Sequence, residues 1–240
     1  MKTTDKPVIV LVHGAFAESA SWNRVIRLLN DSDLRTVAAA NPLRGLAEDA
    51  AYLRDVVEGI DRPVVLVGHS YGGMVISQAA ADLPAVRSLV YVGGFAPETG
   101  ESAIHLSAKF PGSTLRDVLT AYPVPSGGIE FRIADAHFHH QFCADADADE
   151  ADLMAATQRP VTERALTEGL TGAPAWRTVP SWFVFGVMDR NIPAEAARFM
   201  AKRAGSRGTR AIAGASHAIA LSRPEEVAAT ILEAVDGAQG

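Results

Sequence analysis

Short apolar runs alternate along this chain with stretches whose apolar residues follow helical spacing, and this alternation restricts the fold more than any other feature. The runs typical of strands are Pro7–Val12, Leu34–Ala40, Pro63–Val67, Val86–Val92, Trp182–Gly186 and Thr209–Ala213. The helical patterns fall at about Trp22–Leu29, Leu46–Ile60, Gly72–Ala81, Ala194–Ala204 and Arg223–Ala234, with Ser222 and Glu225 spaced as a capping box for the last. We therefore predict an α/β fold, a doubly wound and mostly parallel sheet with right-handed crossovers.

The segment from about Pro97 to Pro180 interrupts this alternation and contains no clear pattern of a strand. A plain loop of that length is rare in a compact domain. We therefore predict an inserted, mainly helical cap at residues 97–180, with helices near Asp149–Gln158 and Thr162–Leu170. Residues 1–96 and 181–240 would form the core, and we expect a single domain overall.

The charge and hydropathy of the chain exclude several classes of partner. Its 240 residues include 22 basic and 28 acidic side chains, which give a formal net charge of −6. No cluster of Lys or Arg offsets this charge, so the pattern of a nucleic-acid-binding protein is missing. The longest apolar runs are strand-sized, far below the ~20 residues of a membrane helix. We expect neither a nucleic-acid nor a membrane partner.

Two features favour a reducing compartment. The first residues, Met1–Lys6, are polar and lead directly into an expected strand, unlike a secretory signal peptide. The single cysteine, Cys143, has no partner for an internal disulfide. We therefore predict a cytoplasmic location.

The strongest chemical signal is the sequence Gly68-His69-Ser70-Tyr71-Gly72-Gly73, which follows a buried strand and opens a helix. This is the context of a nucleophile elbow, in which a serine sits on a tight, strained turn with its hydroxyl exposed. Gly68 and Gly72 would be required because side chains there would collide with the neighbouring strand and helix. A Gly-rich turn of purely structural use is the alternative.

A base and a carboxylate follow in the order that this chemistry needs. Serine is a weak nucleophile and needs a base within hydrogen-bond reach, and His217 follows the last expected strand. Asp189 follows the strand before it, and a buried carboxylate there would fix the imidazole tautomer. Alone, Asp189 could be a turn residue or pair with Arg190. The order Ser70, Asp189, His217, each after a strand, favours a catalytic triad.

The early turn His13-Gly14-Ala15-Phe16 supplies the other half of the predicted site. An oxyanion hole needs two backbone N–H donors, and we predict those of Ala15 and Tyr71. Phe16, next to them, is predicted to contact the substrate. His13 precedes the turn, and we interpret it as a brace for the loop rather than as a catalytic group.

These motifs, together with Asp189-Arg190-Asn191-Ile192-Pro193 and Ser216-His217, resemble the α/β-hydrolase superfamily over nearly the whole chain. Their spacing is similar to the small plant methylesterase and hydroxynitrile lyase branch and its bacterial relatives, and Gln158-Arg159-Pro160 also fits that branch. The resemblance implies that Ser70 is the nucleophile, His217 the base and Asp189 the orienting acid, with Ala15 and Tyr71 as oxyanion donors.

Two departures from the lyases of that branch favour hydrolysis. Hydroxynitrile lyases carry a lysine directly after the catalytic histidine, where this chain has Ala218. They also have a threonine in the early turn, where this chain has Gly14. A serine nucleophile likewise disfavours the dehalogenase and epoxide hydrolase branches, which use an aspartate.

Other clusters have simpler interpretations. His137, His139 and His140 match no structural zinc spacing, so we predict no metal site, with Phe138 and Phe142 packed inside. The acidic run Asp145–Glu150 lacks the glycine and glutamate of a calcium loop and is interpreted as a solvated helix N-terminus. No phosphate-binding glycine motif is present, so no nucleotide cofactor is implied. We interpret five aromatic residues as core, with a pocket wall as the alternative: Trp22, Phe95, Phe110, Trp176 and Trp182.

The sequence therefore predicts a serine esterase that cleaves small carboxylic esters through an acyl-enzyme and uses no cofactor. Two alternatives stay open. One keeps the fold but acts as a carbon–carbon or cyanohydrin lyase or a cofactor-free perhydrolase, and the other is a non-catalytic ligand-binding module. The expected partner is a small-molecule ester, and a homodimer is a further expectation.

Overall fold

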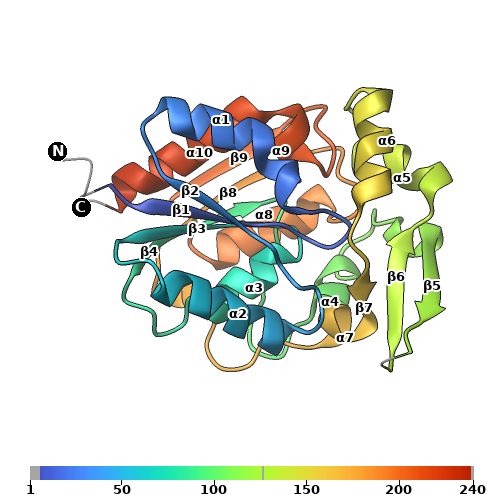
Figure 1. Cartoon of the computed structure of the whole chain (residues 1–240), viewed down its shortest axis with the longest axis horizontal. Coiled ribbons are helices and arrows are strands. Elements are labelled where there is room, and N and C mark those ends of the chain that lie inside the picture. The colour runs from blue at the N-terminus through green and yellow to red at the C-terminus, as the bar shows by residue number, and fades with distance from the viewer. Residues whose placement is uncertain (1–5, 126, 239–240) are drawn as a thin grey trace.

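The computed structural model describes residues 6–125 and 127–238 and contains a six-stranded sheet with helices on both faces (Figure 1). The strands lie in the order β2-β1-β3-β4-β8-β9, and all neighbouring pairs are parallel. Their bounds are β1 (Val8–Val12), β2 (Thr36–Ala39), β3 (Val64–His69), β4 (Val86–Val92), β8 (Ser181–Gly186) and β9 (Gly208–Ile212). The predicted fold class is confirmed. The strand order reverses between β1 and β3, which is where such sheets bind ligands.

Side chains alternate between the two faces of the sheet and enter two separate cores. In β1, Val8, Val10 and Val12 join one buried cluster, while Ile9 and Leu11 join the other. The first face is covered by α2 (Leu46–Glu58), α3 (Gly72–Ala79) and α8 (Ala194–Arg203). The second is covered by α1 (Asn23–Asp31), α9 (Ile219–Ser222) and α10 (Pro224–Gly237). A short 3-10 turn, η1 (Ser19–Trp22), precedes α1.

The segment predicted as a cap lies beyond the carboxyl ends of the strands, at the right of Figure 1. Its helices are α4 (Ala103–Ser107), α5 (Asp135–Phe142), α6 (Ala148–Thr157) and α7 (Glu163–Thr167), with the 3-10 turns η2 (Leu115–Val118) and η3 (Ala175–Arg177). The two helices expected there correspond to α6 and α7, although α7 is shorter than predicted.

The segment also contains an antiparallel sheet that we did not predict. Its strands are β5 (Leu119–Pro123), β6 (Ile129–Ile133) and β7 (Val161–Thr162), in that order. Most of β5 is exposed, so its sequence lacks the apolar run by which the core strands were recognised. The β7 strand has only two residues, too few to show any periodicity.

The segment is bound to the sheet by backbone contacts and by a shared core. The amide of Thr162 donates to the carbonyl of Leu43 at 3.1 Å, and the amide of Phe16 donates to the carbonyl of Arg159 at 3.2 Å. Buried side chains of the segment, such as Phe138, belong to the same cluster as the α2–α3 face of the sheet. The segment therefore packs as a continuation of that core. The boundaries that we predicted for core and cap stay a prediction.

The predicted capping box at the last helix is wrong. Ser222 ends α9, its hydroxyl has no hydrogen-bond partner among the described residues, and Arg223 precedes α10 without a side-chain cap. Pro224 stands in the first turn instead, where a missing N–H costs nothing. Glu225 also lies in that turn, where its negative charge interacts favourably with the positive end of the helix dipole.

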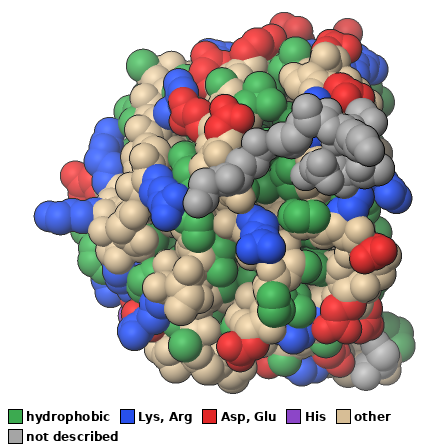
Figure 2. Space-filling model, turned by 90° about the vertical axis from the view of Figure 1, so that its left-hand side faces the viewer, with side chains coloured by type: hydrophobic (Ala, Val, Ile, Leu, Met, Phe, Trp, Pro, Cys, Tyr) green, Lys and Arg blue, Asp and Glu red, His purple; other side chains and the backbone are tan. Residues whose placement is uncertain are grey.

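The surface at the left of Figure 1 carries basic and acidic side chains interspersed (Figure 2). Charges mixed in this way produce no strong field of one sign on that face. Within residues 6–125 and 127–238, no helix combines the length and apolar character needed to cross a bilayer.

Packing of α1 against the sheet generates a stability prediction. Leu29 is fully buried in α1, whereas Leu153 in α6 has 67% of its surface exposed. Leu29→Ala should lower the free energy of unfolding by about 2–5 kcal/mol because it leaves a cavity, and urea denaturation measures this. The matched control Leu153→Ala should change it by about 0.5 kcal/mol or less. Equal losses in the two variants would contradict the assigned core.

Candidate active site

Ser70 lies in the turn between β3 and α3, at the reversal point of the strand order. Its φ is 52°, in the left-handed region that a residue with a side chain rarely adopts. Two backbone bonds hold this conformation: the Ser70 amide donates to the Val92 carbonyl at 3.3 Å, and the Gly73 amide donates to the Ser70 carbonyl at 2.9 Å. The serine therefore sits on a strained turn whose shape is fixed by its neighbours.

Glycines permit the close approach of the segments around this turn. A Cβ on Gly68 would lie 2.6 Å from the Gly72 carbonyl oxygen, and one on Gly72 would lie 2.3 Å from the Val12 carbonyl oxygen. The crowding predicted for Gly68 and Gly72 is therefore present. Gly14 is equally tight, because a Cβ there would lie 2.5 Å from the Ser70 Cβ. The early turn thus packs directly against the serine.

His217 and Asp189 are joined by a hydrogen bond of 2.7 Å between Nδ1 and Oδ2, and both side chains are about 1% exposed. Asp189 Oδ1 accepts from two backbone amides, those of Asn191 at 2.7 Å and Ile192 at 2.9 Å. The carboxylate is thus fixed in orientation by its own loop. When Nδ1 carries the proton and donates this hydrogen bond to the carboxylate, Nε2 has a free lone pair and is the basic nitrogen of the ring.

Ser70 and His217 each lie beside the end of β4, and among the described residues no hydrogen bond joins them. Gly93 follows Val92, the residue that bonds the Ser70 amide, and a Cβ on Gly93 would lie 3.9 Å from His217 Nδ1 and 3.6 Å from Asp189 Oδ2. Within the described part of the chain, Nε2 of His217 is buried without a hydrogen-bond partner. In ligand-free structures such hydrogen bonds are often long and tighten when substrate binds.

Residues that we did not predict hold the His217 loop in place. His69 Nε2 donates to the backbone carbonyl of His217 at 3.0 Å, and the Phe142 ring stands edge-on to the imidazole with 5.0 Å between centroids. The amide of Ala218 donates to the Phe142 carbonyl at 2.9 Å. Phe142 belongs to α5, so the inserted segment packs directly on the imidazole. Nothing local in the sequence indicates this contact.

Asp145 is the second contact from the inserted segment, and it corrects our interpretation of the acidic run. Its Oδ1 accepts from the Ser216 amide at 3.1 Å and from the Ser216 hydroxyl. Its Oδ2 lies 3.3 Å from Arg223 Nη1. Asp145 is therefore a bound carboxylate beside His217. Asp149 lies in the first turn of α6 and is exposed, as we expected of a helix N-terminus.

The predicted oxyanion donors, Ala15 and Tyr71, line the same cavity as Ser70. Within residues 6–125 and 127–238, neither backbone amide has an acceptor. The amide of Phe16, which has a φ of 61°, is already bonded to Arg159. Among the amides of the early turn, the geometry therefore favours Ala15 over Phe16 as a donor to a ligand.

The Tyr71 side chain is anchored beneath the cavity by a buried carboxylate. Its hydroxyl donates to Asp49 Oδ2 at 2.8 Å, and Asp49 Oδ1 accepts from the Arg44 amide at 3.1 Å. Burial raises the pKa of Asp49, and burial together with the nearby carboxylate raises the pKa of Tyr71. The phenol therefore stays protonated and fixes the residue whose backbone N–H is one of the predicted oxyanion donors. Asp49 has no sequence signal beyond its place in a helix.

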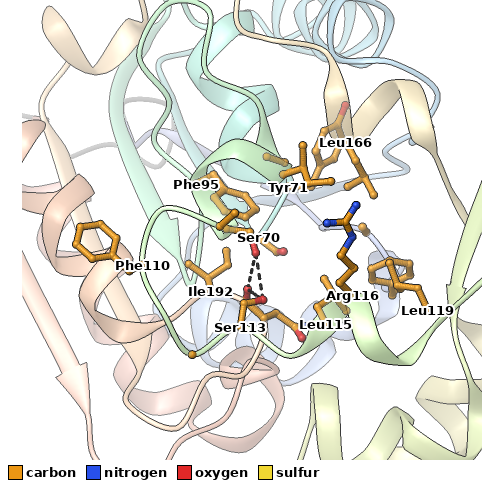
Figure 3. Close-up of a pocket in the computed structure, with 18 of the residues that line it drawn as sticks. Ser70, Tyr71, Phe95, Phe110, Ser113, Leu115, Arg116, Leu119, Leu166 and Ile192 are labelled. Carbon is orange, nitrogen blue, oxygen red and sulfur yellow. Dashed lines mark hydrogen bonds between the residues drawn. The ribbon is translucent and has the colours of Figure 1, made fainter.

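A cavity of about 310 Å³ opens at Ser70 (Figure 3). The sheet supplies its floor, with Ala15, Phe16, Ser70, Tyr71 and Phe95, and the Asp189 loop adds Asn191 and Ile192. Most of its wall comes from the inserted segment: Ala103, Ile104, Ser107, Ala108, Phe110, Pro111, Gly112, Ser113, Leu115, Arg116, Leu119 and Leu166. Phe95 and Phe110, interpreted as core residues, both line the cavity, although Phe95 is also buried in the core as we expected. Periodicity could not show that, because both possibilities require an apolar side chain.

The remaining groups singled out in the sequence are the histidines of α5 and Cys143, which follows that helix. Within the described residues, no group of three or more His, Cys, Asp or Glu side chains is arranged to hold a metal ion. His137 and His140 are exposed, and Phe138 and Phe142 are buried as predicted. Burial, with two acidic neighbours, raises the pKa of Cys143 to about 12, so this thiol is not a nucleophile at neutral pH.

Comparison with known proteins gives one family and several relatives. The model of the alpha/beta hydrolase family matches residues 9–230. An alpha-hydroxynitrile lyase of Arabidopsis thaliana is 23% identical over 91% of this chain and 93% of its own length. A carbendazim hydrolyzing esterase of Nocardioides sp. (strain SG-4G) is 35% identical over 42% of this chain, a match that spans 47% of the esterase.

Among solved structures, polyneuridine aldehyde esterase superposes with a TM-score of 0.81 at 21% sequence identity, covering 95% of this chain and 98% of that one. At this identity the likeness establishes a shared fold. The resemblance that we inferred from four short motifs is confirmed over nearly the full chain.

The contact between Gly14 and Ser70 generates a prediction about activity. Gly14→Ala would force its Cβ against the Ser70 side chain, so the turn must move and turnover of an activated ester should fall by roughly 100-fold, as small misplacements do. Gly59→Ala is the control, because its Cβ would meet only ordinary contacts of 3.4 Å or more. Steady-state kinetics measures both. Full activity of Gly14→Ala would show that the early turn is not confined by the serine.

The buried histidines generate a prediction about pH. Burial lowers the pKa of His13 to about 4 and that of His69 well below its ordinary value of 6.5. The unfolded chain therefore takes up protons first as the pH falls, so stability is complete above about pH 6.5 and declines towards pH 4.

The free energy of unfolding, measured by urea denaturation across this pH range, should decline less steeply with falling pH for His13→Gln than for the native protein. His137→Gln, which changes an exposed histidine, controls for the loss of an imidazole. An unchanged slope in His13→Gln would mean that its protonation is not coupled to folding.

Proposed function

Because the chain belongs to the alpha/beta hydrolase family, we propose that it is a serine hydrolase that cleaves small carboxylic esters through an acyl-enzyme. The observation that carries this proposal is the buried hydrogen bond between His217 and Asp189, at the edge of the sheet where Ser70 occupies its strained turn. Relatives named as esterases support the choice of substrate class. A single cysteine, buried and reduced, supports a cytoplasmic site of action.

In the proposed reaction, the Ser70 hydroxyl attacks the ester carbonyl carbon while its proton passes to His217 Nε2. Asp189 stabilises the resulting imidazolium through the 2.7 Å bond to Nδ1. The negative charge that forms on the carbonyl oxygen is stabilised by the amides of Ala15 and Tyr71, neither of which has another acceptor among the described residues.

Collapse of this intermediate breaks the bond between carbonyl carbon and alkoxy oxygen, and His217 returns its proton to the departing alcohol. The acyl group remains as an ester on Ser70. A water molecule then loses a proton to the same imidazole and attacks the acyl carbon. As the bond between the acyl carbon and the Ser70 oxygen breaks, the imidazolium returns this proton to that oxygen, which releases the acid and regenerates Ser70.

The surroundings of the imidazole favour hydrolysis over the cyanohydrin cleavage that one relative's name describes. Ala218 follows His217, is 4% exposed, and has its amide bonded to Phe142. Among the described residues that line the cavity, the one cation is Arg116, which belongs to η2 and not to the loop of His217, where a lyase would need a cation for the leaving cyanide. The apolar wall suits the hydrocarbon parts of an ester.

Replacement of Ser70 tests the proposal. Ser70→Ala should lower kcat for an activated acetate ester by roughly 1,000-fold or more, because the nucleophile and its base act as a unit. Ser32→Ala, directly after the end of helix α1, is the matched control and should retain activity. The measurement is the rate of chromogenic alcohol release.

Covalent labelling separates the alternatives. A fluorophosphonate should add to Ser70 of the native protein and not to Ser70→Ala, as read by mass spectrometry of the labelled peptide. Turnover of a cyanohydrin without any burst of alcohol from an ester would favour a lyase. Unchanged ester turnover in Ser70→Ala would rule out the proposed chemistry.

A further inference from the structure

Arg116 is the one charged side chain among the described residues that line the Ser70 cavity. It belongs to η2, in the inserted segment, and no Asp or Glu lies on the cavity wall beside it. Figure 3 shows Ser70 between Phe110 on one side and Arg116 on the other. The cavity therefore has an aromatic end and a cationic end, with the serine between them.

The guanidinium of Arg116 has no partner in the described part of the chain. It makes no ion pair, hydrogen bond or ring contact there, although neighbouring arginines do. Arg44 pairs with Glu130, Arg177 pairs with Glu98 at 2.8 Å, and Arg203 pairs with Glu101 at 2.7 Å. Unlike these three arginines, Arg116 has no partner among the described residues, so its five donors are available to a ligand in the cavity.

The environment of Arg116 strengthens its attraction for an anion. Leu115, Leu119 and Leu166 line the same part of the wall, so a ligand group there is partly withdrawn from water. The side chain of Arg116 is itself exposed, so a negatively charged ligand can reach it. A planar guanidinium between apolar walls binds carboxylate oxygens in a bidentate manner more readily than any neutral group.

We propose that Arg116 determines substrate specificity by binding a free carboxylate, so that the preferred substrates are esters with a second, ionised carboxyl group away from the scissile bond. This inference rests on the proposed esterase function. It names the class of substrate: half-esters of dicarboxylic acids when the carboxylate lies on the acyl part, or acyl esters of hydroxy acids when it lies on the alcohol part. Arg116 acts on binding and not on the chemical step.

Matched substrates test the inference. One arm uses the monomethyl esters of dicarboxylic acids from succinic to suberic acid, each compared with the same ester whose free acid is a primary carboxamide. The other arm uses acetate esters of terminal hydroxy acids, again compared with their carboxamides. The readout is the ratio of kcat/KM for the acid to that for the amide, and the better arm identifies which part carries the carboxylate.

The native protein should favour the acid over the amide by about tenfold for the chain length that spans the cavity, the size expected of a hydrogen bond to a charged group. Arg116→Gln should bring the ratio down to about one, Arg116→Lys should restore part of it, and added salt should reduce it. Arg87→Gln removes an exposed arginine at the opposite end of β4 and should leave the ratio unchanged. A native ratio of one in both arms, or the same ratio in Arg116→Gln as in the native protein, would overturn the inference.

Binding measured without turnover separates this inference from the proposed function. Calorimetric titration of the half-esters into Ser70→Ala and into Ser70→Ala/Arg116→Gln requires no hydrolysis. Tighter binding to the first variant than to the second supports a carboxylate site even if no ester is cleaved. Equal binding to both variants contradicts the role of Arg116, whatever the outcome for Ser70.

Discussion

The buried hydrogen bond between His217 and Asp189 is the contact on which the rest of the site depends, and the sheet builds it from two adjacent strands. Because β8 and β9 are parallel neighbours paired through Gly186 and Ile212, the loops that follow them leave the sheet side by side. The amide of Val187 donates to the carbonyl of Ile212, at the end of β9, at 3.0 Å, and the amide of Met188 donates to the carbonyl of Ala215, in the other loop, at 2.9 Å. A Cβ on Gly186 would lie 2.3 Å from the Ala215 carbonyl oxygen, so glycine permits this crossing.

The inserted segment also holds the loop that carries His217. Phe142 and Asp145 come from it, and they bind the backbone of Ala218 and Ser216 on either side of the imidazole. A protonated imidazole in so dry a place would be costly without its carboxylate. The carboxylate in turn keeps its orientation through two backbone amides of its own loop. Enclosure by the segment therefore strengthens the electrostatics of the pair, because water is kept away from it.

The candidate site could be predicted from sequence because each of its three groups follows a strand. Ser70, Asp189 and His217 stand directly after three apolar runs, and parallel strands bring their carboxyl ends to one edge. Patterns within short stretches of the sequence predict nothing further about the site. The β5–β6–β7 sheet, the anchoring of Tyr71 by Asp49 and the role of Asp145 depend on pairings between residues far apart in the chain. The error at Ser222 arose because a short helix, α9, takes up the residue that local spacing assigned to a cap.

The two parts of the cavity are constrained in different ways. Around Ser70, backbone atoms lie so close that Gly14, Gly68 and Gly72 tolerate no Cβ without a shift of the chain. The wall, in contrast, is made of side chains on a segment that carries much exposed surface, including Ile104 and Arg116. Substitution in the wall changes what the cavity binds without moving the serine, whereas substitution in the floor displaces the reacting group itself. A fold divided in this way can change the ligands that its cavity admits while the turn of Ser70 keeps its shape, because backbone contacts confine the turn and side chains form the wall.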